Sequence, residues 1–338
     1  MRLLTPLAVV VAALALAACG SDDDTGGQPG AAQPSATKSA FPVTVEHKFG
    51  TTTIESEPKR VVTVGYTDQD AVLALGVVPV GVGDFLGGYD WRKRPWAQKA
   101  LGGAKPAVVS GQEINFEAVA AQRPDLIIAI NAGLKKSAYE RLSQIAPTVA
   151  QSGDYIDFGM PWEDQTLLVG RALGREEQAR KVVAAVKAKF AKVRSEHPDF
   201  AGKTAILAYG GPDGYGAYST QDTRSRFFSD LGFRTPKRVD QLAGKSFFTA
   251  FSQEQFRLMD QDLVVMYGPE KAIKGNPVVS RLNAVREDRV VYLDLTDQFA
   301  GALGFASALS LPYLLDHEVD ALAAAVDGDR ATAVEQPR

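Results

Sequence analysis

Cysteine is almost absent from this sequence, which has a single one, Cys19, among 338 residues. A lone thiol excludes an internal disulfide, so the chain is not a disulfide-stabilised secreted domain. Histidine is scarce too: the only three, His47, His197 and His317, are far apart, and none has a cysteine beside it. This pattern disfavours a histidine-cluster site for zinc or manganese, and we expect no direct protein ligands to a metal.

Basic charge is not in excess, since 37 Lys and Arg face 40 Asp and Glu for a formal net charge of −3. That balance gives no reason to expect a nucleic-acid partner. The G-x-S-x-G motif of many hydrolases is also missing, and no histidine lies in a context that suggests a catalytic triad. We therefore expect a protein that is not an enzyme and needs no cofactor.

Long apolar runs are missing as well, except at the very start of the chain. Residues 1–18 have the layout of a signal peptide, with Arg2 before the apolar run Leu7–Leu16. The segment ends Leu-Ala-Ala-Cys, which resembles the bacterial lipobox and predicts lipidation of Cys19. An ordinary signal peptide with an incidental cysteine is the alternative. The lipobox interpretation predicts an anchor on the extracytoplasmic face of the cell membrane.

The rest of the chain divides into segments of different composition. Residues 19–42 are rich in Gly, Ser, Pro, Asp and Ala, which predicts a flexible tether. The remainder is long enough for two domains of about 150 residues. Apolar residues at spacings of three and four predict a long helix over 176–194. The sequence thus predicts an α/β protein with an N-terminal lobe at 43–160, linking helices at 161–197, a C-terminal lobe at 198–326 and a tail at 327–338.

Strands alternate with short helices in both halves, which predicts a parallel, Rossmann-like sheet in each lobe. The first half shows a hairpin-like stretch at 43–54, strands at 61–64, 77–82 and 126–130, and a capping box formed by Thr67 and Asp70. The second half shows strands at 204–208, 263–266 and 289–293, a glycine-rich loop at 210–216, and helices at 226–231, 254–259 and 309–325. Two such lobes joined by one helix predict a cleft between them, where ligands usually bind.

A short match between the halves concerns two glutamates. Glu117 and Glu254 are each followed eight positions later by an aspartate and three apolar residues. Asn115 and Ser252 precede them by two positions and can cap a helix, which places both carboxylates in a first turn. In the simpler interpretation, both glutamates only complement a helix dipole.

Seven phrases of the sequence resemble the substrate-binding proteins of ABC importers for ferric siderophores, haem and vitamin B12. In order along the chain they are 58–64, 74–82, 117–128, 144–149, 170–175, 277–294 and 307–316. The resemblance implies the class III periplasmic-binding-protein fold, in which one long helix bridges two lobes. It also implies that Glu117 and Glu254 dock on an ABC permease, and that the ligand is a ferric siderophore held by a monomer. Cobalamin or haem is the alternative within the class, and a lipid-anchored hydrolase is the alternative outside it.

The loop after the predicted strand at 77–82 is the main candidate for ligand contact. It carries three cations between two tryptophans, Trp91-Arg92-Lys93-Arg94-Pro95-Trp96. Arginine suits the oxygens of an anionic iron chelate, and tryptophan offers a flat face to its apolar parts. Ligands bind beyond the carboxyl ends of strands in open α/β sheets, which favours this loop. A solvated turn whose tryptophans pack on the lobe is the alternative.

Further aromatic residues and arginines follow other predicted strands, or precede the linking region or the predicted docking segment at Glu254. We expect ligand contacts from the set Tyr66, Trp91, Arg92, Arg94, Trp96, Tyr155, Tyr215, Tyr218, Arg226 and Phe247. Each member has packing as its alternative role, and Arg226 could instead form an ion pair with Asp230 one helical turn away. Because the set contains both rings and cations, the sequence leaves open whether the siderophore is a hydroxamate, a catecholate or a carboxylate.

Overall fold

The computed structural model describes residues 40–85, 89–329 and 331–337, apart from the side chain of Trp91. The signal peptide, Cys19 and nearly all of the tether therefore lie outside the described residues. No helix in the described part of the chain is long and apolar enough to cross a membrane.

The first sheet is parallel throughout, as predicted. Its strand order is β5-β4-β3-β6-β7, and every neighbouring pair is parallel. The strands are β3 (Val61–Thr63), β4 (Gly81–Gly83), β5 (Ala107–Ser110), β6 (Leu126–Ala129) and β7 (Thr148–Ala150). Four short helices connect them: α1 (Asp68–Ala74), α2 (Pro95–Leu101), α3 (Phe116–Ala121) and α4 (Lys136–Ser143). Before them, β1 (Val43–His47) and β2 (Gly50–Ile54) form the predicted hairpin.

The second sheet is mixed, so the prediction of a purely parallel sheet is wrong there. Its order is β10-β9-β8-β11-β12, and β9 runs antiparallel to both of its neighbours. The strands are β8 (Ala205–Gly211), β9 (Gly214–Tyr218), β10 (Phe248–Ala250), β11 (Leu263–Tyr267) and β12 (Val290–Leu293). The glycine-rich stretch expected to be a loop is instead the tight hairpin between β8 and β9. Gly214 has φ +125°, a conformation that other residues rarely adopt.

Helices surround the second sheet, and some of the expected ones have different bounds. The α-helices are α7 (Thr223–Leu231), α8 (Lys237–Ala243), α9 (Glu270–Lys274), α10 (Asn283–Arg286), α11 (Gln298–Phe305), α12 (Ser310–His317) and α13 (Val319–Val326). The predicted single helix at 309–325 is thus two helices. The predicted helix at 254–259 is the 3-10 helix η3 (Gln253–Met259). Other 3-10 turns are η1 (Trp91–Lys93), η2 (Pro198–Phe200) and η4 (Val279–Arg281).

The predicted strand at 77–82 is shorter than expected because its first residues finish helix α1. The backbone N–H groups of Gly76 and Val77 donate to carbonyls of α1, at 2.9 and 3.2 Å. Only Gly81–Gly83 pairs with the sheet as β4. Local hydrogen bonds of a helix end therefore outweigh the β-branched composition of this stretch.

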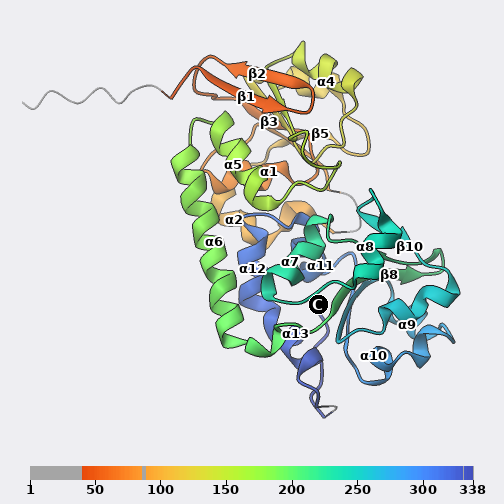
Figure 1. Cartoon of the computed structure of the whole chain (residues 1–338). Helices are drawn as coiled ribbons and strands as arrows, with labels where there is room; N and C mark the ends of the chain where they lie inside the picture. Colours follow the sequence, from red (N-terminus) through yellow and green to blue (C-terminus); the bar gives the residue numbers. More distant parts are fainter. Residues whose placement is uncertain (1–39, 86–88, 330, 338) are drawn as a thin grey trace, which may run out of the picture. The chain divides into compact units, whose positions relative to one another are not determined.

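One long helix contributes to the cores of both sheets, as predicted. Helix α6 (Glu176–Glu196) packs against α5 (Trp162–Ala172) at one end and against α12 at the other (Figure 1). Ala179 near its start belongs to the core over the first sheet, with Val61 and Leu126. Val186 and Phe190 further along belong to the core over the second sheet. We call the part of the molecule built on each sheet a lobe.

Candidate functional site

A cavity of about 270 Å³ lies between the two lobes, and most of its larger lining side chains are aromatic rings. We call it the aromatic cavity. Its lining residues are Tyr66, Thr67, Phe85, Asn131, Phe158, Asp222, Thr223, Arg224, Phe247, Tyr267, Leu295, Ala300 and Gly304. Tyr66, Phe85 and Asn131 come within three residues after β3, β4 and β6. The cavity therefore lies at the carboxyl edge of the sheet, where open α/β folds bind ligands.

The rings come from both lobes and contact one another across the cavity. Phe158 stacks on Tyr66 with 6.1 Å between ring centroids, and the edge of Phe247 meets Phe158 at 6.0 Å. Phe85 stacks on Phe305 of helix α11 at 4.8 Å. Rings in this arrangement present flat apolar faces to whatever enters.

Phe158 is held in an unusual backbone conformation, with φ +65°. A bulky residue in the left-handed region is strained, and such strain is concentrated at ligand-binding and active sites. Gly133 makes room for the ring, since a Cβ at that position would lie 2.7 Å from the ring of Phe158. The fold therefore places this ring in the cavity at an energetic cost.

A buried carboxylate, Asp68 at the start of α1, shapes the wall that carries Tyr66 and Asn131. It accepts hydrogen bonds from the backbone N–H groups of Gly65, Ile130 and Asn131, at 3.1, 3.0 and 2.8 Å. Burial raises the pKa of Asp68 to about 6, against the lowering effect of these three donors. The carboxylate thus joins the turns after β3 and β6 beneath the cavity.

The charged side chains of the lining are one arginine and one aspartate, and they are bonded to each other. Arg224 donates from Nε and Nη2 to the two carboxylate oxygens of Asp222, at 2.9 and 2.7 Å. The guanidinium lies over the ring of Tyr218, 3.9 Å from its centroid. Asp222 also caps helix α7 by accepting from the N–H of Arg224. Both charges are therefore fixed by local structure.

Helix α11 approaches the rings of the first lobe closely because two of its residues are glycines. A Cβ on Gly301 would lie 2.7 Å from the ring of Tyr89, and one on Gly304 would lie 2.5 Å from the ring of Phe85. The hydroxyl of Tyr89 also donates to Oε1 of Gln298 at 2.8 Å. The two lobes thus meet ring against helix backbone beside the cavity.

The loop of tryptophans and cations does not line the cavity in the way the sequence predicts. Arg94 has 1% side-chain exposure and donates to Asp70, whose side chain has 0%, at 3.0 Å. Trp96 donates from its indole to the same carboxylate at 2.8 Å, and Ser307 of the second lobe does so at 2.7 Å. We call this group, Asp70, Arg94, Trp96 and Ser307, the sealed contact.

The predicted capping box is also wrong, because Asp70 is used in the sealed contact. Thr67 precedes α1 but makes no side-chain cap, and its hydroxyl accepts from Nδ2 of Asn131 at 2.6 Å. Arg92 is exposed and lies 3.5 Å from Asp90. The side chain of Trp91 is outside the described residues.

The other candidates divide between the cavity and packing roles. Tyr66 and Phe247 line the cavity. Tyr155 donates to Asp164 at 2.5 Å, and Tyr215 is buried against Phe256 in the core of the second lobe. Tyr218 lies behind the lining, under Arg224.

The alternative role suggested for Arg226, an ion pair with Asp230, is not formed. Arg226 donates to the carbonyls of Thr220 and Gly159, at 3.2 and 3.0 Å, and so ties the loop before α5 to the second lobe. The structure therefore gives Arg226 and Tyr215 packing contacts in place of the predicted contacts with the cavity.

Sequence reasoning missed three of the main lining side chains, Phe85, Phe158 and Tyr267. Phe85 and Tyr267 lie at the ends of β4 and β11, so the rule that ligands bind at strand ends could have found them. Arg224 follows the strand predicted at 204–208, as Tyr215 and Arg226 do, but the expected set of ligand contacts included those two residues and not Arg224. Nothing local to Phe158 predicts its left-handed backbone.

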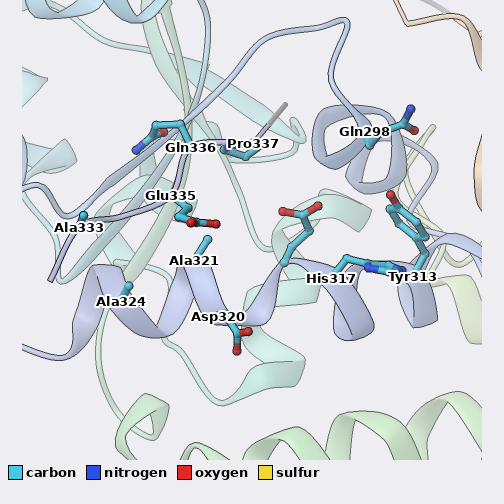
Figure 2. A pocket seen from close by; sticks show the side chains of 11 residues that line it. Gln298, Tyr313, His317, Asp320, Ala321, Ala324, Ala333, Glu335, Gln336 and Pro337 are labelled. Carbon is cyan, nitrogen blue, oxygen red and sulfur yellow. The ribbon is translucent and has the colours of Figure 1, made fainter.

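A second cavity, of about 680 Å³, lies in the second lobe alone, against the C-terminal tail. Figure 2 shows Tyr313 and His317 on one side of it and Glu335 on the other. Its lining is acidic, with Glu318, Asp320 and Glu335, and burial raises the pKa of Glu318 to about 6. No cluster of three or more His, Cys, Asp or Glu in the described residues could hold a metal ion. The aromatic cavity, which both lobes line, is therefore the better candidate.

The two duplicated glutamates are exposed, and their predicted caps are confirmed. Asn115 accepts from the N–H of Ala118 at 2.9 Å at the start of α3. Ser252 forms a capping box with Gln255 at the start of η3. Glu117 and Glu254 thus each lie in the first turn of a helix, on the surface of a different lobe.

Comparison with known proteins gives a consistent result. Residues 61–295 match a family described as periplasmic binding protein. The chain is 27% identical to the Fe(3+)-citrate-binding protein YfmC of Bacillus subtilis, over 74% of this chain and 78% of the relative.

Solved structures agree with the family match. A periplasmic solute binding protein of Mycobacterium smegmatis is 36% identical and has a TM-score of 0.74, with 84% of this chain and 98% of that chain covered. The ferrichrome complex of PiaA from Streptococcus pneumoniae is 25% identical and has a TM-score of 0.75, with 85% and 99% covered.

Proposed function

The chain belongs to the periplasmic binding protein family, and we propose on that basis that its aromatic cavity captures a ferric siderophore for delivery to an ABC permease. The observation that carries this proposal is a ring-lined cavity that both lobes share at the carboxyl edge of the first sheet. The siderophore's own oxygens hold the iron, and the protein contacts the outer surface of the chelate. The process is binding and hand-over, with no bond made or broken.

Titration of the protein with ferric chelates tests this function. Trp96 lies beside the cavity, with its ring 5.5 Å from that of Phe305, so its fluorescence reports binding. We expect quenching by at least one of ferrichrome, ferric citrate and ferric enterobactin, and none by the iron-free ligands or by free Fe³⁺. If only haem or cobalamin quenches the fluorescence, the siderophore assignment is wrong.

Delivery to the permease is proposed to use Glu117 and Glu254, one on each lobe. Their exposed carboxylates suit arginines on a membrane partner, whose charge they would complement. We expect Glu117→Lys with Glu254→Lys to abolish iron uptake in cells and to leave the affinity for the chelate unchanged. Glu113→Lys with Glu270→Lys is the matched control, because it reverses two other exposed carboxylates. Loss of chelate affinity in the first pair, or of uptake in the control, would contradict the assignment.

Lipidation of Cys19 is the proposed means of attachment, with the monomeric protein on the extracytoplasmic face of the cell membrane. The Leu-Ala-Ala-Cys sequence and the tether that follows support it. Cys19→Ser is expected to release the protein from the membrane fraction without changing its chelate affinity. Retention of the Ser variant in that fraction would argue for an uncleaved signal segment as the anchor.

A further inference from the structure

The charge of the aromatic cavity bears on which kind of chelate it takes. Among the described residues of the lining, Asp222 and Arg224 are the charged ones, and their opposite charges meet in a two-point ion pair. The charge of Arg224 is thus already paired with the carboxylate of Asp222 before any ligand binds. The rest of the lining consists of rings, aliphatic groups and the neutral side chains of Thr67, Asn131 and Thr223.

The three cations of the loop that the sequence favoured for ligand contact have other partners. Arg94 is buried in the sealed contact, and Arg92 and Lys93 lie 3.5 and 3.2 Å from Asp90. Residues 86–88, next to the lining residue Phe85, are Leu, Gly and Gly and bring no charge.

Charged residues that flank the lining add no net positive charge. Asp84 adjoins Phe85, and Lys245 lies two positions before Phe247, so these two are of opposite sign. Asp297 lies between Leu295 and Ala300 and caps helix α11, with its carboxylate accepting from the N–H of Ala300. Asp68, Asp157 and Asp294 also adjoin lining residues, and Arg226 lies two positions after Arg224, so the residues that neighbour the lining in sequence carry a net negative charge. A chelate with several negative charges would lose hydration there without gaining an unpaired cation.

Resting on the proposed function, we propose that the cavity selects a ferric chelate of zero net charge with an apolar outer surface, namely a ferric tris-hydroxamate. Three hydroxamates, each with one negative charge, cancel the charge of Fe³⁺. The methylene and peptide groups around the metal then pack on the rings of Tyr66, Phe85, Phe158 and Phe247. The exposed Leu295, at 53%, extends this apolar surface at the edge of the cavity.

A competition between chelates of different charge tests the inference. We expect ferrichrome, which is neutral, to bind at least tenfold more tightly than ferric citrate or ferric enterobactin, which are anionic. Its affinity is expected to change less than twofold between 50 and 500 mM NaCl, because little charge is involved. Tighter binding of an anionic chelate would overturn the inference and leave the proposed function intact. Failure to bind any ferric chelate would overturn both.

The ion pair itself supplies the second test. Asp222→Asn keeps a side chain that caps α7 and frees the charge of Arg224. The preference for ferrichrome over ferric citrate should then fall at least tenfold. Asp316→Asn is the matched control, since it removes an exposed carboxylate that pairs with Lys189 outside the cavity, and it should keep the wild-type ratio. An unchanged ratio in Asp222→Asn would show that Asp222 serves only the helix and would overturn the inference.

Discussion

The sealed contact and the aromatic cavity both lie where the two lobes meet. Each contains an arginine bonded to an aspartate among aromatic rings. In the sealed contact the two side chains are 1% and 0% exposed, whereas in the cavity Arg224 and Asp222 are 22% and 5% exposed. The difference lies in the partners: Asp70 also accepts from Trp96 and Ser307, which close over it. An arginine among aromatic rings is thus fully buried where the second lobe covers its carboxylate, and lines the cavity where the pair stays partly exposed.

The largest expected effect comes from breaking the sealed contact. Arg94→Met leaves Asp70 as a buried charge without its cation, which should lower the free energy of unfolding by about 3–5 kcal/mol. Urea unfolding measures the change. Arg92→Met is the control, because Arg92 is 69% exposed and its substitution should cost less than about 0.5 kcal/mol. Equal effects for the two variants would show that the sealed contact contributes no more to stability than an exposed ion pair.

A substitution in the aromatic cavity should lower the affinity for the chelate more than it lowers the stability of the fold. Phe158→Ala removes the ring that spans Tyr66 and Phe247, and we expect chelate affinity to fall roughly ten- to hundredfold, or about 1.4–2.8 kcal/mol. Calorimetric titration measures the affinity. Phe116→Ala is the control: its ring packs under Arg141 outside the cavity lining, so affinity should hold within twofold.

The smallest expected effect concerns the part of the sealed contact that the second lobe supplies. Ser307→Ala removes the hydrogen bond to Asp70, and we expect a loss of about 1–2 kcal/mol in the free energy of unfolding. Ser195→Ala should cost less than about 0.5 kcal/mol, since Ser195 is exposed and bonds only to its own helix. A neutral Ser307→Ala would mean that Arg94 and Trp96 satisfy Asp70 by themselves.

Those features of the fold that depend on local pattern could be predicted from the sequence. The stripe of α6 and the buried runs of β6 and β11 follow directly from the spacing of apolar residues. The mixed second sheet could not be predicted, because whether Gly210–Gly216 forms a loop or a hairpin depends on the neighbouring strand β10. The length of β4 likewise depends on hydrogen bonds to α1.

The candidate site was less predictable, since it depends on which side chains the second lobe covers. Tyr66 was found because it follows a predicted strand, and Phe247 because it precedes the predicted docking segment at Glu254. Arg94 and Trp96 have the same signal in sequence, but Asp70 and Ser307 enclose them, and that pairing spans 237 positions of the chain. Phe158 is placed by its positive φ angle, which the residue type does not predict.

Gly301 and Gly304 set how near the halves of this protein can come. Because both residues lack a side chain, helix α11 packs directly on the rings of Tyr89 and Phe85, and a larger residue at either position would push the helix away from them. The distance between helix α11 and the first lobe is thus limited by two residues that have no side chain, and one of them, Gly304, also lines the aromatic cavity.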